Sequence, residues 1–162
     1  MTGETQTPPC AVTIHTDGAC LGNPGPGGFG AIVDFGDRKQ ELSGGFRLTT
    51  NNRMELLAVI EALSCLPEPC AVTLVTDSRY VHDAIEKRWL ASWQKKGWVN
   101  AEKKPVKNQD LWRQLIPLLS THRIQFSWVR GHTGNPENER CDALASAAAR
   151  QRGLPDDTGY AK

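Results

Sequence analysis

The sequence predicts an α/β fold in which a five-stranded mixed sheet, three antiparallel strands plus two parallel strands, is flanked by helices. Strand-like segments joined by short turns come first, over residues 12–48, and short turns join antiparallel neighbours. Helical patterns then separate the last two strand-like segments, because parallel strands need a crossover connection. The length of 162 residues fits one domain. We therefore predict a single domain over residues 1–162, with a core of about residues 10–152.

The first three strands are predicted from alternation and from turn residues. Val12–Asp17 alternates apolar and polar side chains, as a strand with two different faces does. Residues 18–28 are dense in Gly and Pro and are expected to form a loop. Phe29–Phe35 and Gln40–Leu48 follow as the second and third strands, with a turn at Asp37 between them.

Cap residues and apolar stripes indicate the remaining elements. Ser78 is expected to cap one helix, and Asn135 to cap the last helix with Pro136 at its first position. Pro117 should kink or shorten the helix that contains it. The expected segments are helices over Asn52–Cys65, Trp89–Lys96, Asp110–Ser120 and 136 to about 150, strands over Val72–Asp77 and Ile124–Val129, and a polar tail over 153–162 that should fray.

Composition indicates an ordinary globular protein. Hydrophobic residues make up 39% and charged residues 23% of the chain, which is enough to build a core. No run approaches the ~18 apolar residues that span a bilayer, and residues 1–9 lack the apolar centre of a signal peptide. We therefore expect a cytoplasmic protein without a membrane partner. Its five cysteines include no close CxxC pair, and we expect reduced, mostly buried thiols.

Charge is distributed unevenly along the chain. The formal net charge is only +1, but the segment from Lys87 to Lys107 carries +6 and the rest of the chain −5. Trp89, Trp93 and Trp98 are interleaved with these basic residues. A charge run is usually only a solvated face, yet basic side chains with flat rings can also hold phosphates and stack on sugars or bases.

Four carboxylates stand at positions where active sites form. Asp17 and Asp77 end strands at the edge where α/β folds bind ligands, although a lone Asp there is commonly a turn former or a helix cap. Glu55 and Asp142 lie near the starts of helices and share helical faces with small residues. Four converging carboxylates would need cations, and two Mg²⁺ ions would balance them in a site for phosphodiester hydrolysis.

Two loop motifs leave alternatives open. His132 lies in Gly131–Gly134, where it could move a proton at the leaving group or be an ordinary surface histidine. Gly25–Gly30 matches the dinucleotide-binding pattern, but a strand-like segment follows where that motif needs a helix. We therefore interpret these glycines as turn formers, or as a place where a nucleic-acid backbone approaches closely.

Several fragments together closely resemble bacterial type 1 ribonuclease H over nearly the whole chain, from about residue 12 to residue 160. Each fragment alone is weak, but their order over this length is highly specific. The matching fragments are Thr16–Gly18, Asn23–Gly28, Thr50–Glu55, Thr76–Ser78 and Gly131–Asp142. The resemblance implies a ribonuclease H-like fold and an endonuclease that cuts the RNA strand of RNA–DNA hybrids, leaving 5′-phosphate and 3′-hydroxyl ends. We expect a monomer, because nothing in the sequence suggests an obligate apolar interface.

The resemblance also implies roles for individual residues. Asp17, Glu55, Asp77 and Asp142 would bind Mg²⁺ or Mn²⁺, and His132 would be an auxiliary catalytic residue. Substrate-binding positions would contact the minor groove, a DNA-strand phosphate or the rest of the hybrid, the latter through a basic protrusion over Trp89–Val99. These positions are Asn23, Thr50, Asn51, Asn52, Arg79, Trp89, Trp93, Lys95, Lys96, Trp98 and Asn108.

Two departures and two alternative functions accompany this hypothesis. Arg79 stands where relatives often carry Gln, and Leu48 where many carry an Arg for the DNA phosphate, which neighbouring Arg47 replaces only if it faces the same side. Another nuclease on the same fold, such as a junction resolvase, would cut duplex DNA equally. A binding module without catalysis would hold the hybrid without cutting it.

Overall fold

The computed structural model describes residues 10–128 and 135–160. Within them a five-stranded sheet has the order β3-β2-β1-β4-β5. Its antiparallel pairs are β1–β2 and β2–β3, and its parallel pairs are β1–β4 and β4–β5. The predicted fold class is confirmed. In chain order the elements are β1 Ala11–Cys20, β2 Gly25–Asp34, β3 Lys39–Thr49, α1 Asn51–Ser64, β4 Ala71–Thr76, α2 Arg79–Glu86, α3 Trp89–Lys95, α4 Gln109–Thr121, β5 Arg123–Trp128 and α5 Pro136–Ala149.

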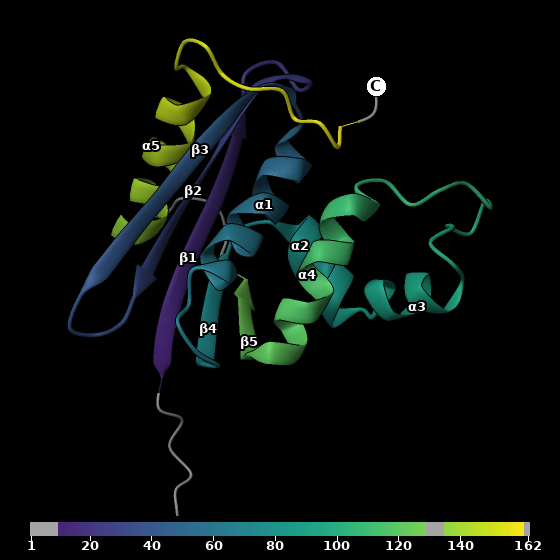
Figure 1. Cartoon of the computed structure of the whole chain (residues 1–162), viewed down its shortest axis with the longest axis horizontal. Coiled ribbons are helices and arrows are strands. Elements are labelled where there is room, and N and C mark those ends of the chain that lie inside the picture. Colours follow the sequence, from purple (N-terminus) through teal and green to yellow (C-terminus); the bar gives the residue numbers. More distant parts are fainter. Residues whose placement is uncertain (1–9, 129–134, 161–162) are drawn as a thin grey trace, which may run out of the picture.

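Helices cover both faces of the sheet (Figure 1). Helix α5 lies alone on one face, whereas α1, α2 and α4 lie on the other. Helix α3 and the chain that follows it project furthest from the sheet. The basic segment identified in the sequence is therefore a protrusion on the α1 side.

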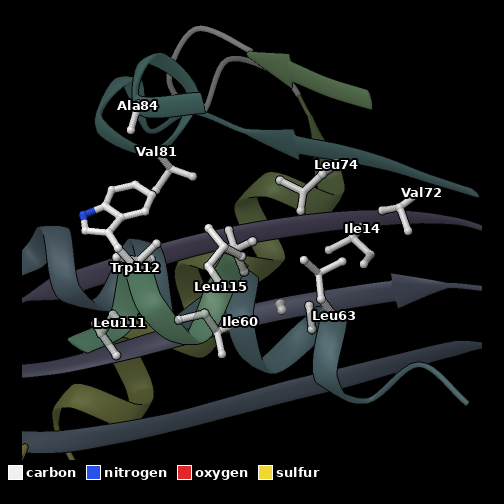
Figure 2. Packing of buried hydrophobic residues seen from close by; sticks show 14 of the residues in the cluster. Ile14, Ile60, Leu63, Val72, Leu74, Val81, Ala84, Leu111, Trp112 and Leu115 are labelled. Atoms are coloured by element: carbon white, nitrogen blue, oxygen red, sulfur yellow. The ribbon is translucent and has the colours of Figure 1, made fainter. Parts of the chain in front are cut away.

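The hydrophobic core lies between the sheet and helices α1, α2 and α4 (Figure 2). The apolar stripe of α1 packs on inward-facing residues of β1 and β4, such as Ile14 and Leu74, which are both fully buried. Trp112 of α4 is fully buried beside Val81 of α2. This packing joins the helices to β1, which contains Asp17, and to β4, which Asp77 follows directly.

Local capping signals are confirmed, but Pro117 does not end its helix. The side chain of Ser78 accepts a hydrogen bond from the Val81 N–H, and Asn135 likewise caps α5. Helix α4 continues past Pro117 to Thr121. Pro117 is exposed, so water can satisfy the carbonyl that loses its helical partner, and the expected shortening is wrong.

The glycine-rich segment belongs to two strands, so the predicted loop over residues 18–28 is wrong. Only the bend between β1 and β2 needs a turn glycine, at Gly22 with φ of +70°. A Cβ on Gly28 would lie 2.3 Å from the Ala145 carbonyl oxygen, and one on Gly30 would lie 2.4 Å from that of Cys141. These two glycines admit the backbone of α5 against β2, so they are not turn formers. A close approach of a nucleic-acid backbone to Gly25–Gly30 stays a prediction.

Two cysteines are joined, so the expectation of five reduced thiols is wrong. Cys10 and Cys70 form a disulfide across a separation of 60 residues. They precede β1 and β4, which are neighbouring parallel strands, and the Ala71 N–H donates to the Cys10 carbonyl at 2.8 Å. Cys20, Cys65 and Cys141 are thiols. Sequence spacing carries no signal for such a pair, because the sheet brings the two residues together.

The C-terminal tail is anchored through residues 155–160, where we expected fraying. The Arg47 N–H donates to the Pro155 carbonyl at 3.0 Å. The Asp157 carboxylate accepts from Thr49 Oγ1 and from Arg53 Nε, both at 2.7 Å. A buried arginine therefore holds a segment that looks like a polar end in the sequence.

Acidification should weaken the fold through His122. Burial lowers the pKa of this side chain below its usual 6.5, and its Nδ1 accepts from the Cys70 N–H at 3.1 Å. Below about pH 6.5 the unfolded chain therefore binds a proton that the folded chain does not, and unfolding becomes easier, by at most about 1.4 kcal/mol per pH unit for each such proton.

The variant His122→Asn isolates this contribution, because an amide oxygen can still accept from Cys70 but does not titrate. Urea unfolding at pH 7.5 and pH 5.5 should show a smaller loss of stability for the variant than for the parent protein. Other titrating groups are common to both proteins and cancel in the comparison. An identical pH dependence would contradict the prediction.

Candidate active site

Three carboxylates from different elements meet at one end of the sheet. Asp17 lies in β1, Asp77 follows β4 directly, and Glu55 lies in α1. One ligand oxygen from each can be chosen so that all lie within 4.8 Å of one another. The parallel register pairs Thr16 with Thr76, so the two aspartates that come next stand at the same level of neighbouring strands. The prediction that Asp17, Glu55 and Asp77 converge is confirmed.

Gly18 lets the helix carry Glu55 into the site. A Cβ at Gly18 would lie 2.6 Å from the Glu55 backbone nitrogen, so a side chain there would push α1 away from β1. The Thr50 hydroxyl caps α1 by accepting from the Arg53 N–H at 3.2 Å. We expected small residues on α1 to allow this approach, and Ala58 is indeed fully buried, but the closest contact depends on the strand glycine.

Burial and mutual repulsion make the cluster electrostatically unfavourable without a cation. Asp17 is 3% and Glu55 6% exposed. Burial, together with the charges of Asp17 and Asp77, raises the pKa of Glu55 well above its ordinary value. Within the described residues the Glu55 Oε2 atom is buried without a hydrogen-bond partner. Closely spaced carboxylate oxygens of this kind are the ligands that Mg²⁺ and Mn²⁺ prefer, so the residues fit a hard divalent cation.

Asp142 and His132 are not brought into this group by the described structure. Asp142 is half-buried on α5, and the set of three carboxylates does not include it. Its neighbour Cys141 donates from Sγ to the His15 carbonyl at 3.3 Å, which seats this part of α5 on β1 two residues before Asp17. His132 lies outside the described residues. A ligand role for Asp142 and a proton-transfer role for His132 stay predictions.

Arg79 lies at the rim of the carboxylate pocket, which Asn51 and Asn52 also line. Its guanidinium carbon lies 4.6 Å from the centre of the Trp128 ring. Trp128 in turn donates from Nε1 to the Asp77 carbonyl at 3.1 Å. The sequence analysis did not identify Trp128. Its indole N–H holds the backbone of Asp77, and its ring faces the guanidinium of Arg79.

A second pocket adjoins the first, and Asn52 lines both. Asn23, Thr50 and Asn108 line the second pocket, so four of the predicted substrate-binding residues gather there. The Asn23 side chain accepts from the Asn51 N–H at 3.0 Å, which ties the β1–β2 bend to the start of α1. Asn52 thus connects the two pockets next to the carboxylates.

A family model for RNase H matches residues 9–150. The chain belongs to the RNase H family. The curated ribonuclease H of Nitratidesulfovibrio vulgaris is 64% identical over 149 residues, which cover 92% of this chain and 96% of that protein. The ribonuclease H of Aeromonas hydrophila is 56% identical with the same coverage of both chains.

Solved RNase H structures resemble this fold. LC9-RNase H1, a type 1 RNase H with the type 2 active-site motif, is 33% identical with a TM-score of 0.79, and the match covers 90% of this chain and 74% of that chain. LC11-RNase H1 in complex with an RNA/DNA hybrid is 23% identical with a TM-score of 0.63, and the match covers 85% of this chain and 96% of that chain. At that identity the likeness shows the fold alone.

The tryptophans of the protrusion differ in this RNase H chain. Trp89 is 39% exposed, whereas Trp98 is 9% exposed and belongs to the core cluster. Trp93 packs on Trp112 with ring centres 5.6 Å apart. Lys95 and Lys96 are exposed on the same short helix and the residue after it. Burial leaves Trp98 no open face for stacking, so of the three rings Trp89 best suits contact with substrate.

None of the helices in the described residues of this RNase H chain is long and apolar enough to cross a membrane.

Proposed function

We propose that this chain is a metal-dependent endoribonuclease that hydrolyses the RNA strand of RNA–DNA hybrids and leaves 5′-phosphate and 3′-hydroxyl ends. One observation carries the proposal: Asp17, Glu55 and Asp77 converge beyond the sheet in a chain of the RNase H family. Relatives that span almost the same length are named ribonuclease H. Membership of this family also argues against the junction resolvase alternative.

The three carboxylates, with Asp142 as a proposed fourth ligand, would hold two Mg²⁺ ions, and Mn²⁺ could substitute. When bound, the ions supply the positive charge that favours attack of water on the phosphate and departure of the 3′-oxygen. The chain's own contribution is to hold the ligands rigidly. The Gly18 N–H donates to Asp17 Oδ1 at 2.9 Å, and Trp128 holds the Asp77 backbone. His132 would move a proton at the leaving group.

Substrate selection would come from the polar side chains that line these two pockets. Asn23, Asn51 and Asn52 would face the minor groove, where RNA displays its 2′-hydroxyls. Thr50 and Asn108 would hold a DNA-strand phosphate, and Lys95, Lys96 and Trp89 would grip the hybrid further away. Arg47 pairs with Asp156 of the tail, so it would have to leave this exposed pair to bind the phosphate in place of an arginine at position 48. A monomeric state and a cytoplasmic location stay predictions.

Matched substrates of one sequence test the proposed function. RNA–DNA hybrid, duplex DNA, duplex RNA and single-stranded RNA, each with one strand labelled at a time, are incubated with Mg²⁺ or with EDTA. Magnesium-dependent cutting of only the RNA in the hybrid is expected, with 5′-phosphate product ends. Binding of the hybrid without cutting, by a protein shown to be folded, would instead support the binding-module alternative.

Replacing Arg79 by Gln should weaken hybrid binding through one lost phosphate contact. Each contact of this kind releases about one counterion, so the slope of log KM against log salt concentration should fall by about 0.9. At low salt KM should rise several-fold while kcat stays close to that of the parent. Arg123→Gln is the matched control, because Arg123 is exposed at the opposite end of β5 from Trp128. Equal slopes for parent and Arg79→Gln would show that Arg79 does not touch a phosphate.

A further inference from the structure

A buried arginine begins a chain of hydrogen bonds that leads to the substrate surface. Arg53 is 2% exposed, and its guanidinium binds two carboxylates, those of Asp110 and Asp157. Its Nη1 also donates to Asn108 Oδ1 at 3.3 Å. Because a guanidinium can only donate, it holds the oxygen of the Asn108 amide toward itself and leaves the NH₂ group on the other side.

The amide orientation decides what Tyr80 can do. Asn108 Nδ2 donates to the Tyr80 hydroxyl oxygen at 3.1 Å. Trp112 Nε1 donates to the same oxygen at 3.0 Å, and an indole nitrogen is only a donor. The two acceptor positions of the hydroxyl are thus both occupied by donors. The proton of Tyr80 has to point away from both of them, and the hydroxyl acts toward its remaining surroundings as a donor.

The Tyr80 side chain is also held in place at the junction of the two pockets. Its ring lies against Trp112, with centroids 5.4 Å apart. Tyr80 lines the pocket of the carboxylates, and its partner Asn108 lines the second pocket. Asn52 lines both. A nucleic-acid backbone that occupied both pockets would therefore pass close to Tyr80.

We propose that the Tyr80 hydroxyl is a substrate-binding hydrogen-bond donor to a backbone phosphate of the bound hybrid, and that Arg53 is the positioning residue that sets its direction through Asn108. A phosphate oxygen is a suitable partner because it accepts only and is charged, which makes such a bond stronger than a neutral one. This proposal rests on the proposed function, which supplies the hybrid.

The test combines Tyr80→Phe with hybrids that each carry one methylphosphonate, which removes the charge of a single phosphate on either strand. Loss of one charge-assisted hydrogen bond should raise KM for the unmodified hybrid about tenfold, with kcat within about twofold of the parent. At one position the methylphosphonate should raise KM of the parent, whereas KM of Tyr80→Phe should be the same for this hybrid and for the unmodified one. Arg53→Lys, which can no longer hold Asn108 in the same way, should raise KM in the same direction.

Thermal unfolding of each variant separates binding from folding. The parent should be sensitive to methylphosphonate at several positions, because Arg79, Thr50 and Asn108 are also proposed to bind phosphates, and Tyr80→Phe should remove the sensitivity at only one of them. The proposal would be overturned if the effects of Tyr80→Phe and of the methylphosphonate on KM were additive at every position. It would also be overturned if Tyr80→Phe changed kcat and KM equally on all hybrids, and Tyr80 would then be a structural residue. Failure of the parent to cut the unmodified hybrid would refute the proposed function. In that case the affinities of the parent and of Tyr80→Phe for the same hybrids would still test whether the Tyr80 hydroxyl donates to a phosphate.

Discussion

Replacing Asp77 by Asn should lower kcat for cleavage of an RNA–DNA hybrid by about a thousandfold or more, while the protein stays folded. The amide keeps the size of the side chain but removes a negative charge from the three carboxylates that meet at the sheet edge. A site that works by holding divalent cations against a phosphate depends on that charge. Steady-state cleavage of a labelled hybrid in Mg²⁺ measures the effect.

The same substitution should stabilise the metal-free protein. The charge of Asp77 helps to raise the pKa of Glu55 above its ordinary value, so Glu55 costs the fold stability once the pH exceeds the pKa of this side chain in the unfolded chain. An acid with a raised pKa weakens the fold as the pH rises above its unfolded value of about 4.5. In EDTA at pH 7.5, Asp77→Asn should therefore melt at a higher temperature than the parent, and this difference should shrink as the pH falls toward 4.5.

Asp37→Asn is the matched control for both measurements. This substitution makes the same chemical change in an exposed turn between β2 and β3. The activity of Asp37→Asn should stay within about twofold of the parent, and its melting temperature in EDTA should equal that of the parent. A kcat close to that of the parent in folded Asp77→Asn would contradict the assignment of Asp77 to the catalytic site.

Replacing Asp157 by Ala should lower the free energy of unfolding by about 3 kcal/mol. The Asp157 side chain is 10% and that of Arg53 2% exposed, and the loss leaves a buried guanidinium with only part of its compensation. Thr49 Oγ1, which is also buried, loses its acceptor at the same time. Urea unfolding at neutral pH measures the change, and the slope against urea should stay the same.

Asp156→Ala is the control next along the chain. Asp156 pairs with Arg47, but both side chains are more than half exposed, at 61% and 68%. Water and salt screen such a pair, so its loss should cost less than about 1 kcal/mol. Equal, small effects of the two substitutions would mean that the tail frays in solution, as the sequence alone suggested.

Elements with local causes could be predicted from the sequence. The alternation over Val12–Asp17 and the apolar stripe of the first helix depend only on neighbouring residues, as do the caps at Ser78 and Asn135. Boundaries were right within a few residues except in the glycine-rich segment. There the glycines resemble a loop, and only the presence of α5 over β2 explains why Gly28 and Gly30 sit in a strand.

The candidate site divides in the same way. Asp17 and Asp77 were identified because each was predicted to end a strand. β1 in fact continues past Asp17 to Cys20, but its parallel pairing with β4 runs as far as Thr16 and Thr76, so the two aspartates still stand side by side. The residues that support them escaped notice: Trp128 binds the Asp77 backbone from 51 positions away, and Gly18 looked like any turn glycine. Trp98 was predicted to stack on substrate but is buried, because a sequence pattern does not state which side of a protrusion faces the core.

By itself, the sequence determined the order and type of the elements, the four candidate carboxylates and the likeness to one family of nucleases. These follow from residue types and from their spacing along the chain. Only the tertiary structure decided the Cys10–Cys70 pair, the anchoring of the tail on Arg53 and the direction of the Tyr80 hydroxyl. Each of these depends on atoms that are far apart in the chain and close in space, and hydrogen bonds and burial act only over such short distances.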